Sequence, residues 1–313
     1  MRFFESSTNP QRSLSGQGAR YWTCLMLFAG LGLSSKVLAI DLMPEDAIAP
    51  PVGLQSLQLR AIASKYQGAY LDGRRLNPDS QLTAEGAALR YARVTEFFGR
   101  PTVIYADQSY GELKTRLDGA KDAGPTLGDL SVAVAHWLLN DAVQHRYAGV
   151  VGYLVAPTGD YDPRFTSGYV NTNLGQNRWT FALQTGYSAR VFTDLTWLVA
   201  ADVIWFGKND EFSPNGRLVT LEQRPLKTIQ NHLSQRVTPP WMIGLGHIWT
   251  TGGRWLVDGL DLGNEENTHR LQLSSTYDFP GAFRLGLQAG RALKTKNGLA
   301  EKREVTVRLW HFF

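Results

Sequence analysis

The side chains that could carry out chemistry are scattered along this 313-residue chain. It has no G-x-S-x-G turn, no H-E-x-x-H helix, no Walker loop and a single cysteine, Cys24. The six histidines share no spacing typical of metal ligands: they are His136, His145, His232, His247, His269 and His311. A hydrolase would need a hydroxyl nucleophile, a histidine and an acid together at one rim. The sequence therefore predicts a protein that is not an enzyme and uses no cofactor or metal.

One acidic stretch and three of the histidines leave room for other interactions. The acidic residues of the predicted loop 252–266 are Asp258, Asp261, Glu265 and Glu266. Such a loop stays solvated, attracts Ca²⁺ or bridges lipopolysaccharide. His136, His247 and His311 lie on apolar faces near the ends of predicted strands. That position favours an interfacial imidazole over a metal ligand.

A group of charged residues recurs opposite apolar residues at alternate positions. Its members are Arg60, Arg90, Glu96, Arg178, Asp202, Arg270, Arg284, Glu304 and Arg308. If the apolar side faces lipid, these charges point into a barrel, where substitutions tune selectivity. Two interpretations remain open. The charges, with Trp137 and Trp310, line a channel suited to a small aromatic acid or phenol, or they pair with one another and fill the interior.

Alternation of apolar and polar residues also predicts the elements that position these charges, because two residues is the period of a β-strand. In residues 301–313, Val305, Val307 and Leu309 alternate with charged or polar neighbours, and the chain stops on Phe313. The predicted strands are 55–64, 89–97, 102–110, 130–138, 147–156, 178–188, 195–205, one ending near 236, 241–249, 270–277, 283–289 and 301–313. They predict an all-β chain, a transmembrane antiparallel up-and-down β-barrel of about twelve strands.

The connections between these strands alternate in length. Short turns are predicted at residues 99–100, 140–144, 191–193, 237–239 and 278–281, and longer loops at 69–85, 111–125, 157–176, 207–218, 252–266 and 293–300. Short periplasmic turns and long external loops are typical of a membrane barrel. An interfacial aromatic girdle is predicted near strand ends at Trp179, Trp197, Trp205, Trp241 and Trp249. A soluble barrel would have to hide the whole apolar face in its core.

The first residues resemble an export signal. Basic residues precede the apolar run Tyr21–Leu33, and Val37-Leu38-Ala39 forms a small-residue cleavage site. We predict a signal peptide at residues 1–39, an extended periplasmic lead-in at 40–51 and a barrel at 52–313. Removing residues 1–39 takes away four basic groups and one acid, so the net charge falls from +4 to +1. The mature protein would therefore have no marked attraction for nucleic acid.

Two stretches resemble a known family. They are Ala156-Pro157-Thr158-Gly159-Asp160-Tyr161-Asp162-Pro163 and Asn173-Leu174-Gly175-Gln176-Asn177-Arg178-Trp179. The chain resembles the outer-membrane proteins associated with the meta-cleavage pathway of phenol degradation, which are regarded as transporters. The resemblance extends from about Val52 to Phe313 and includes the turn from Arg93 to Pro101. It implies an outer-membrane barrel whose final Phe313 is read by the assembly machinery.

These observations give a leading functional hypothesis and an alternative. The first is passive diffusion of small hydrophobic or aromatic compounds through a channel in the outer membrane of a Gram-negative cell. Its expected partners are the lipid bilayer, lipopolysaccharide, the assembly machinery and small hydrophobic solutes. The alternative is a non-transporting envelope barrel that has a structural or adhesive role through its external loops.

Overall fold

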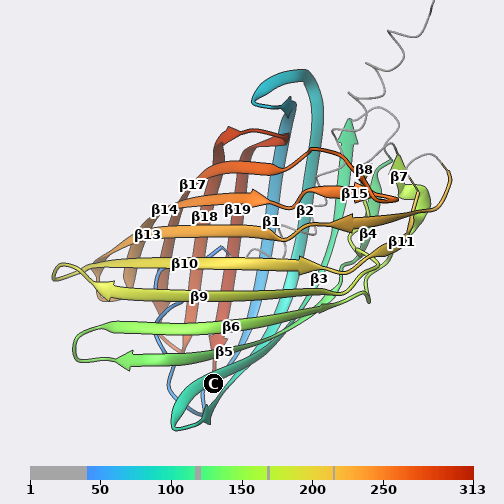
Figure 1. Ribbon diagram of the computed structural model, residues 1–313. Helices are drawn as coiled ribbons and strands as arrows, with labels where there is room; N and C mark the ends of the chain where they lie inside the picture. Colours follow the sequence, from blue (N-terminus) through green and yellow to red (C-terminus); the bar gives the residue numbers. More distant parts are fainter. Residues whose placement is uncertain (1–40, 117–120, 168–169, 214–215) are drawn as a thin grey trace, which may run out of the picture.

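Twelve antiparallel strands close into one barrel in the computed structural model, which describes residues 41–116, 121–167, 170–213 and 216–313. The barrel strands are β1 (Gln55–Leu71), β2 (Arg74–Phe97), β3 (Arg100–Arg116), β5 (Leu130–Asp141), β6 (Arg146–Ala156), β9 (Thr180–Arg190), β10 (Leu195–Phe206), β13 (Leu226–Thr238), β14 (Trp241–Gly252), β17 (Glu266–Phe279), β18 (Phe283–Thr295) and β19 (Gly298–Phe312). The predicted twelve-strand barrel is confirmed (Figure 1). The predicted signal peptide lies outside the described residues.

The ring closes between its first and last strands. β1 pairs with β19 from Ser56 opposite Phe312 to Tyr70 opposite Gly298, and β2 pairs with both β1 and β3. The backbone of Phe313 continues this ladder: its N–H donates to the carbonyl of Gln55 at 3.0 Å, and the N–H of Gln55 donates back at 2.9 Å. Both ends of the barrel sequence therefore meet at one rim.

That rim is the short-turn end of the barrel. Connections of two to four residues join β2 to β3, β5 to β6, β9 to β10, β13 to β14 and β17 to β18 there. In the first of them, Phe98 and Gly99 both have positive φ, 50° and 69°, the backbone that a two-residue type I′ hairpin turn requires. The opposite rim, the loop end, carries the four long connections, from β3 to β5, β6 to β9, β10 to β13 and β14 to β17, and two short turns, from β1 to β2 and from β18 to β19. In bacterial barrels short turns lie on the periplasmic side.

The faces of the strands are inverted relative to a soluble protein. On β19, Val305 and Leu309 are 46% and 43% exposed, whereas Thr306 and Arg308, which lie between them in the sequence, are 3% and 5% exposed. The same alternation runs along β10, β13, β14 and β17. Apolar side chains that face outward need lipid around them, and buried polar ones need partners inside. This arrangement excludes the soluble barrel.

The predicted tryptophans lie near both ends of the apolar wall. Trp197 and Trp241 are near the short-turn end, and Trp179, Trp205 and Trp249 are near the loop end. Trp197 and Trp205 are eight residues apart on β10, or about 26 Å along the strand. His311 takes a similar place at the short-turn end, where its ring stacks on that of Phe283 with the centroids 4.5 Å apart. The role of these tryptophans as an interfacial girdle stays a prediction.

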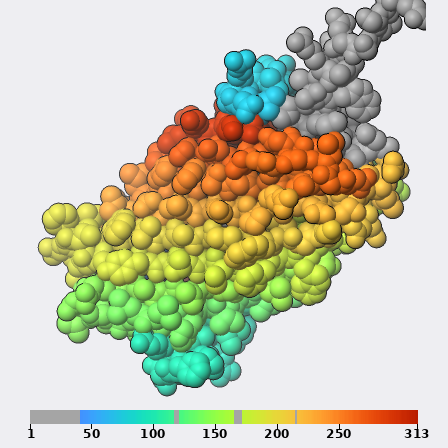
Figure 2. Space-filling model, viewed as in Figure 1, coloured from blue at the N-terminus to red at the C-terminus, as the bar shows by residue number. Residues whose placement is uncertain are grey.

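The strands are longer than the sequence indicated, which corrects two predicted loops. Residues 69–85 and 293–300 are mostly strand, joined by turns at Asp72-Gly73 and at 296–297. Asp72 and Gly73 have φ of 46° and 78°, again a type I′ turn. Alternation marks a strand only where its faces meet lipid and lumen, so polar extensions beyond the bilayer escape a pattern search. Figure 2 shows the β1–β2 hairpin projecting above the wall.

Short elements cover the loop end. β4 (Ala123–Leu127) pairs with β3, and a second sheet contains β11 (Asn209–Phe212), β12 (Val219–Gln223), β15 (Trp255–Val257) and β16 (Leu260–Asp261). A 3-10 turn (Pro163–Phe165) and the pair β7 (Thr166–Ser167) and β8 (Val170–Asn171) complete the loops. Phe212, Leu221, Trp255 and Val257 form a small apolar core there. No helix in the described ranges is long and apolar enough to cross a membrane.

Candidate functional site: the barrel lumen

Residues 41–50, here called the lumen segment, lie inside the barrel (Figure 1). The sequence predicted an extended periplasmic lead-in at 40–51, so the structure corrects this position. The segment turns on itself: the N–H of Asp46 donates to the carbonyl of Met43 at 3.2 Å, and that of Ile48 donates to Glu45 at 2.9 Å. The acidic side chains of the segment find basic partners on the inner wall, which accounts for its place in the lumen.

Side chains from four strands bind the backbone at the start of the segment. The N–H of Leu42 donates to Oε1 of Gln230 at 3.2 Å, and its carbonyl accepts from Gln272 at 3.1 Å and Gln288 at 3.3 Å. Arg308 donates to the carbonyl of the preceding residue at 2.9 Å. Backbone groups removed from water need such partners. These side chains of β13, β17, β18 and β19 hold the extended backbone across the lumen.

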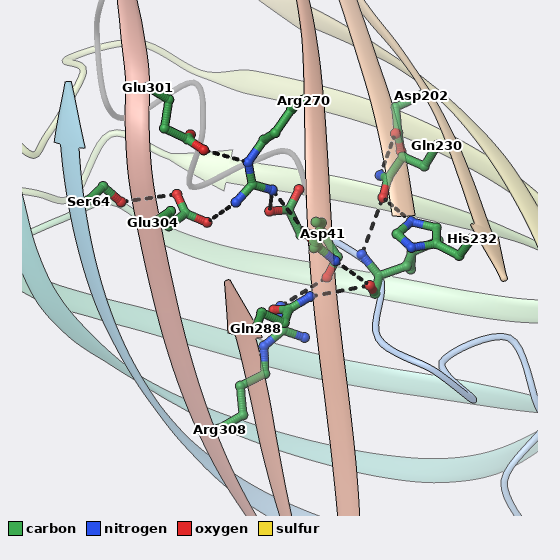
Figure 3. A network of polar contacts seen from close by, with 12 residues as sticks. Asp41, Ser64, Asp202, Gln230, His232, Arg270, Gln288, Glu301, Glu304 and Arg308 are labelled. Carbon is green, nitrogen blue, oxygen red and sulfur yellow. Dashed lines mark hydrogen bonds and ion pairs between the residues drawn. The ribbon is translucent and has the colours of Figure 1, made fainter. Parts of the chain in front are cut away.

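One arginine gathers three carboxylates beside this backbone (Figure 3). Arg270 on β17 pairs with Asp41 of the lumen segment, and with Glu301 and Glu304 of β19 at 2.7 Å each. Ser64 on β1 donates to the second oxygen of Glu304 at 3.0 Å. The side chain of Arg270 is 8% exposed. Asp41 therefore completes a buried ion cluster that joins the segment to two strands.

A second set of ion pairs holds the turn of the segment. Glu45 pairs with Arg236 of β13 and, at 3.0 Å, with Arg284 of β18. Asp46 lies 4.0 Å from Nη1 of Arg308. Charged partners on three strands thus face two neighbouring acidic residues. The segment is attached to the wall by contacts that break without any covalent change.

The neighbouring wall, formed by β1, β2 and β3, carries its own basic and aromatic cluster. Asp107 on β3 accepts from Arg90 of β2 at 2.7 and 2.9 Å, and Arg60 of β1 lies 3.5 Å away. The guanidinium of Arg90 also sits 4.3 Å from the ring centroid of Tyr105, a cation–π contact. The ring of Tyr105 meets that of Tyr153 edge-on at 6.2 Å. This wall therefore presents aromatic faces next to cations.

A hydrogen-bond chain connects that wall to the lumen segment. The hydroxyl of Tyr153 donates to Gln184 at 3.2 Å, and Gln184 donates to Asp202 at 2.5 Å. Gln230 also donates to Asp202, at 3.2 Å, while its own oxygen accepts from the N–H of Leu42. Asp202 is 4% exposed, so these amides supply the hydrogen bonds that water would otherwise give.

Two cavities flank the lumen segment. The first, of about 250 Å³, is bordered by β1, β2, β3, β5, β6, β18 and β19, and the second, of about 270 Å³, lies toward β9, β10, β13 and β14. Met43, Pro44, Glu45 and Ile48 border both. Trp137, whose indole N–H donates to the carbonyl of Ala47 at 2.8 Å, borders the first. The segment therefore divides the lumen without filling it.

Comparison with known proteins identifies the family. Residues 65–308 match the family described as "Putative MetA-pathway of phenol degradation". The chain belongs to this family. No curated protein matches the sequence.

Solved structures agree with this assignment. The COG4313 outer membrane channel from Pseudomonas putida F1 is similar, with 26% identity, a TM-score of 0.80 and coverage of 87% of this chain and 100% of that one. The β domain of the Bordetella autotransporter BrkA has 12% identity, a TM-score of 0.55 and coverage of 83% and 99%. The transport unit of the autotransporter AIDA-I from Escherichia coli has 10% identity, a TM-score of 0.50 and coverage of 93% and 96%. The last two share the fold alone. The chain is an outer-membrane β-barrel of the phenol-degradation family.

The two stretches that resembled this family, residues 156–163 and 173–179, stabilise the loops at the loop end. A Cβ on Gly159 would lie 2.6 Å from the backbone of Gly128, and one on Gly175 would lie 2.7 Å from that of Gly159. The backbones at these three glycines therefore pack closer than a side chain at Gly159 or Gly175 would allow. Asp129 accepts from the backbone N–H of Gly159 and of Gln176, both at 2.9 Å. Burial raises the pKa of Asp129, and these hydrogen bonds oppose the rise. The motifs thus fasten two loops together.

The nine charges predicted to face the interior separate into two groups. Seven lie on the inner faces of barrel strands: Arg60, Arg90, Asp202, Arg270, Arg284, Glu304 and Arg308. Glu96 is instead exposed at the short-turn end of β2. Arg178 precedes β9 at the loop end, where it donates to Gln176 and to Gln223 at 2.6 Å. The part of all nine in selectivity stays a prediction.

Sequence reasoning missed several residues of the lumen network. Asp107 sits on the inner face of a correctly predicted strand, so its alternate position could have revealed it. Asp41, Glu45 and Asp46 precede the first strand, and only their acidic character was apparent. The acidic loop residues Asp261 and Glu265 pair with Arg254, both at 3.1 Å.

Proposed function

We propose that this barrel is an outer-membrane channel for passive diffusion of small hydrophobic or aromatic compounds, of the phenol or aromatic-acid type. The similar Pseudomonas putida protein is titled an outer membrane channel, and the family description concerns phenol degradation. The observation that carries the proposal is the pair of cavities beside a lumen segment held by non-covalent contacts. Displacement of this segment joins the cavities into a path lined by arginines and aromatic rings. The arginines attract carboxylates or phenolates.

Conductance in planar bilayers tests the channel. The protein purified from outer membranes is compared with a variant that lacks residues 41–50, all of which precede β1. We expect steps of current from the full protein and larger, more frequent steps from the deletion variant. A matched control deletes the exposed tip of the β1–β2 hairpin, residues 72–77, outside the lumen.

One observation favours the alternative, a non-transporting envelope barrel. The buried charges of the lumen form ion pairs with one another, as a sealed interior would need. A structural barrel predicts that neither the full protein nor the variant lacking residues 41–50 carries current. Folded, heat-modifiable protein with no conductance in both forms would reject the channel.

A further inference from the structure

We propose that the 250 Å³ cavity is a binding site for a single-ring aromatic carboxylate, whose carboxylate binds Arg308 and whose ring lies against Tyr105 and Trp137. This inference narrows the ligand class of the proposed channel and so rests on that proposal. Binding itself is measurable without conduction, and the two ideas therefore fail separately.

The cation of the site has an unused donor. Arg308 borders the cavity and is 5% exposed. Its Nη2 donates to the Asp41 carbonyl at 2.9 Å, whereas Nη1 lies 4.0 Å from Asp46, beyond hydrogen-bond distance, and the buried Nε–H also has no acceptor. Leaving a buried charged donor unsatisfied is costly. A ligand carboxylate that takes the place beside Nη1 would accept a charge-assisted hydrogen bond, a class that is among the strongest hydrogen bonds in proteins.

The remaining lining suits an aromatic ring. Tyr105, Trp137 and Tyr153 come from three neighbouring strands, and Val103 and Val151 fill the space between them. An apolar cavity of about 150 Å³ is large enough for one benzene molecule. The 250 Å³ here therefore has room for a ring and its carboxylate. The second cavity, bordered by Ser188, Thr196 and Ser234, has no comparable aromatic group apart from Tyr147.

Asp46 occupies the place of a ligand carboxylate. It lies 4.0 Å from Nη1 of Arg308, too far for a hydrogen bond, and its Oδ2 accepts from the N–H of Met43 at 2.7 Å. An incoming carboxylate therefore competes with Asp46 for the same guanidinium. Since Asp46 belongs to the lumen segment, ligand binding also weakens one contact that holds the segment.

Fluorine NMR of the full protein in detergent tests the site with two matched probes, 4-fluorobenzoate and 4-fluorophenol. We expect 4-fluorobenzoate to bind roughly tenfold or more tightly than 4-fluorophenol, the difference expected for a charge-assisted hydrogen bond. Hexanoate, which has the carboxylate without a ring, should displace 4-fluorobenzoate poorly.

Four variants locate the site. Arg308→Met removes the cation and Ala92→Leu fills the cavity without changing charge, and each should weaken 4-fluorobenzoate binding roughly tenfold or more. Thr196→Leu fills the second cavity and should leave binding unchanged. Asp46→Asn removes the competing carboxylate, keeps an acceptor for Met43, and should tighten binding; a purely structural Asp46 would give no gain.

Each other result overturns the proposal. Equal binding of the two probes would mean that the site recognises the ring without the carboxylate. Loss of binding in Thr196→Leu but not in Ala92→Leu would move the site to the second cavity. An absence of binding to the folded wild-type protein, checked by heat-modifiable mobility, would reject the site even if the barrel conducts.

Discussion

At the residue scale, the lumen depends on charges that share partners. Arg270 serves three carboxylates, two from β19 and one from the lumen segment, and its side chain is almost completely buried. Several interactions therefore depend on one guanidinium. Its removal leaves three neighbouring negative charges without the cation that they share.

We expect Arg270→Met to lower the free energy of unfolding by about 3–5 kcal/mol, the range for breaking a buried ion pair from one side. Reversible urea unfolding in lipid vesicles measures it. Adding Glu301→Gln and Glu304→Gln should restore part of the loss, because it removes the like charges. If the triple variant is no more stable than Arg270→Met, repulsion among these carboxylates is not the cause.

A second prediction at this scale concerns the outward face. Leu287 on β18 is 46% exposed and points away from the lumen, as its neighbours Phe283 and Leu285 do. Leu287→Arg should cost about 2–4 kcal/mol near the middle of the bilayer, whereas Leu287→Ala should cost much less. The same urea titration applies. Tolerance of the arginine would place this face against water.

At the scale of elements, the lumen segment differs from the strands around it. Barrel strands are held by continuous ladders of backbone hydrogen bonds, whereas the segment is held mainly by side chains. Ion pairs at Glu45 and Asp41 fix its two parts. We therefore expect the segment to open more readily than any strand, at a lower free energy.

Glu45→Gln should release the turn of the segment, because Glu45 has ion pairs with both Arg236 and Arg284. Hydrogen exchange followed by mass spectrometry should show faster exchange across residues 41–50 and unchanged exchange in β13 and β18. Glu112→Gln, which removes an acid that pairs with the exposed Lys114, is the matched control. Equal exchange in wild type and Glu45→Gln would show that the turn does not depend on these pairs.

At the scale of the whole molecule, the barrel depends on the meeting of its two ends. Phe313 bonds to Gln55 through both backbone groups, and its ring lies 5.6 Å from that of His311. The final residue thus contributes a backbone pair to the closing ladder and an aromatic ring to the rim. These two contributions can be removed separately.

Deletion of Phe313 should lower the yield of folded barrel more than Phe313→Ala does, because the alanine variant keeps the two backbone hydrogen bonds. Phe313→Ala should still fall below wild type, since it loses the terminal aromatic side chain. The amount of heat-modifiable protein in outer-membrane fractions measures both. Equal yields of folded barrel from the deletion variant and wild type would show that assembly does not depend on Phe313.

The sequence by itself determined the barrel. Alternation with a period of two is a local property, since neighbouring side chains on a strand point to opposite sides whatever the strand pairs with. The strand number, the inward direction of Arg270, Arg284 and Arg308 and the outward tryptophans followed from it. Polar strand extensions such as residues 74–85 were not predicted, because apolar and polar residues do not alternate in them.

Only the tertiary structure decided what fills the lumen. The contacts of Asp41 and Leu42 with β13, β17, β18 and β19 join residues 188 to 267 positions apart in the chain. No local pattern records such a separation, because an acidic segment outside a barrel and one folded into it have the same composition. Closure of the strands places basic side chains from distant strands around one axis, and that ring of charge then gives the acidic segment its place.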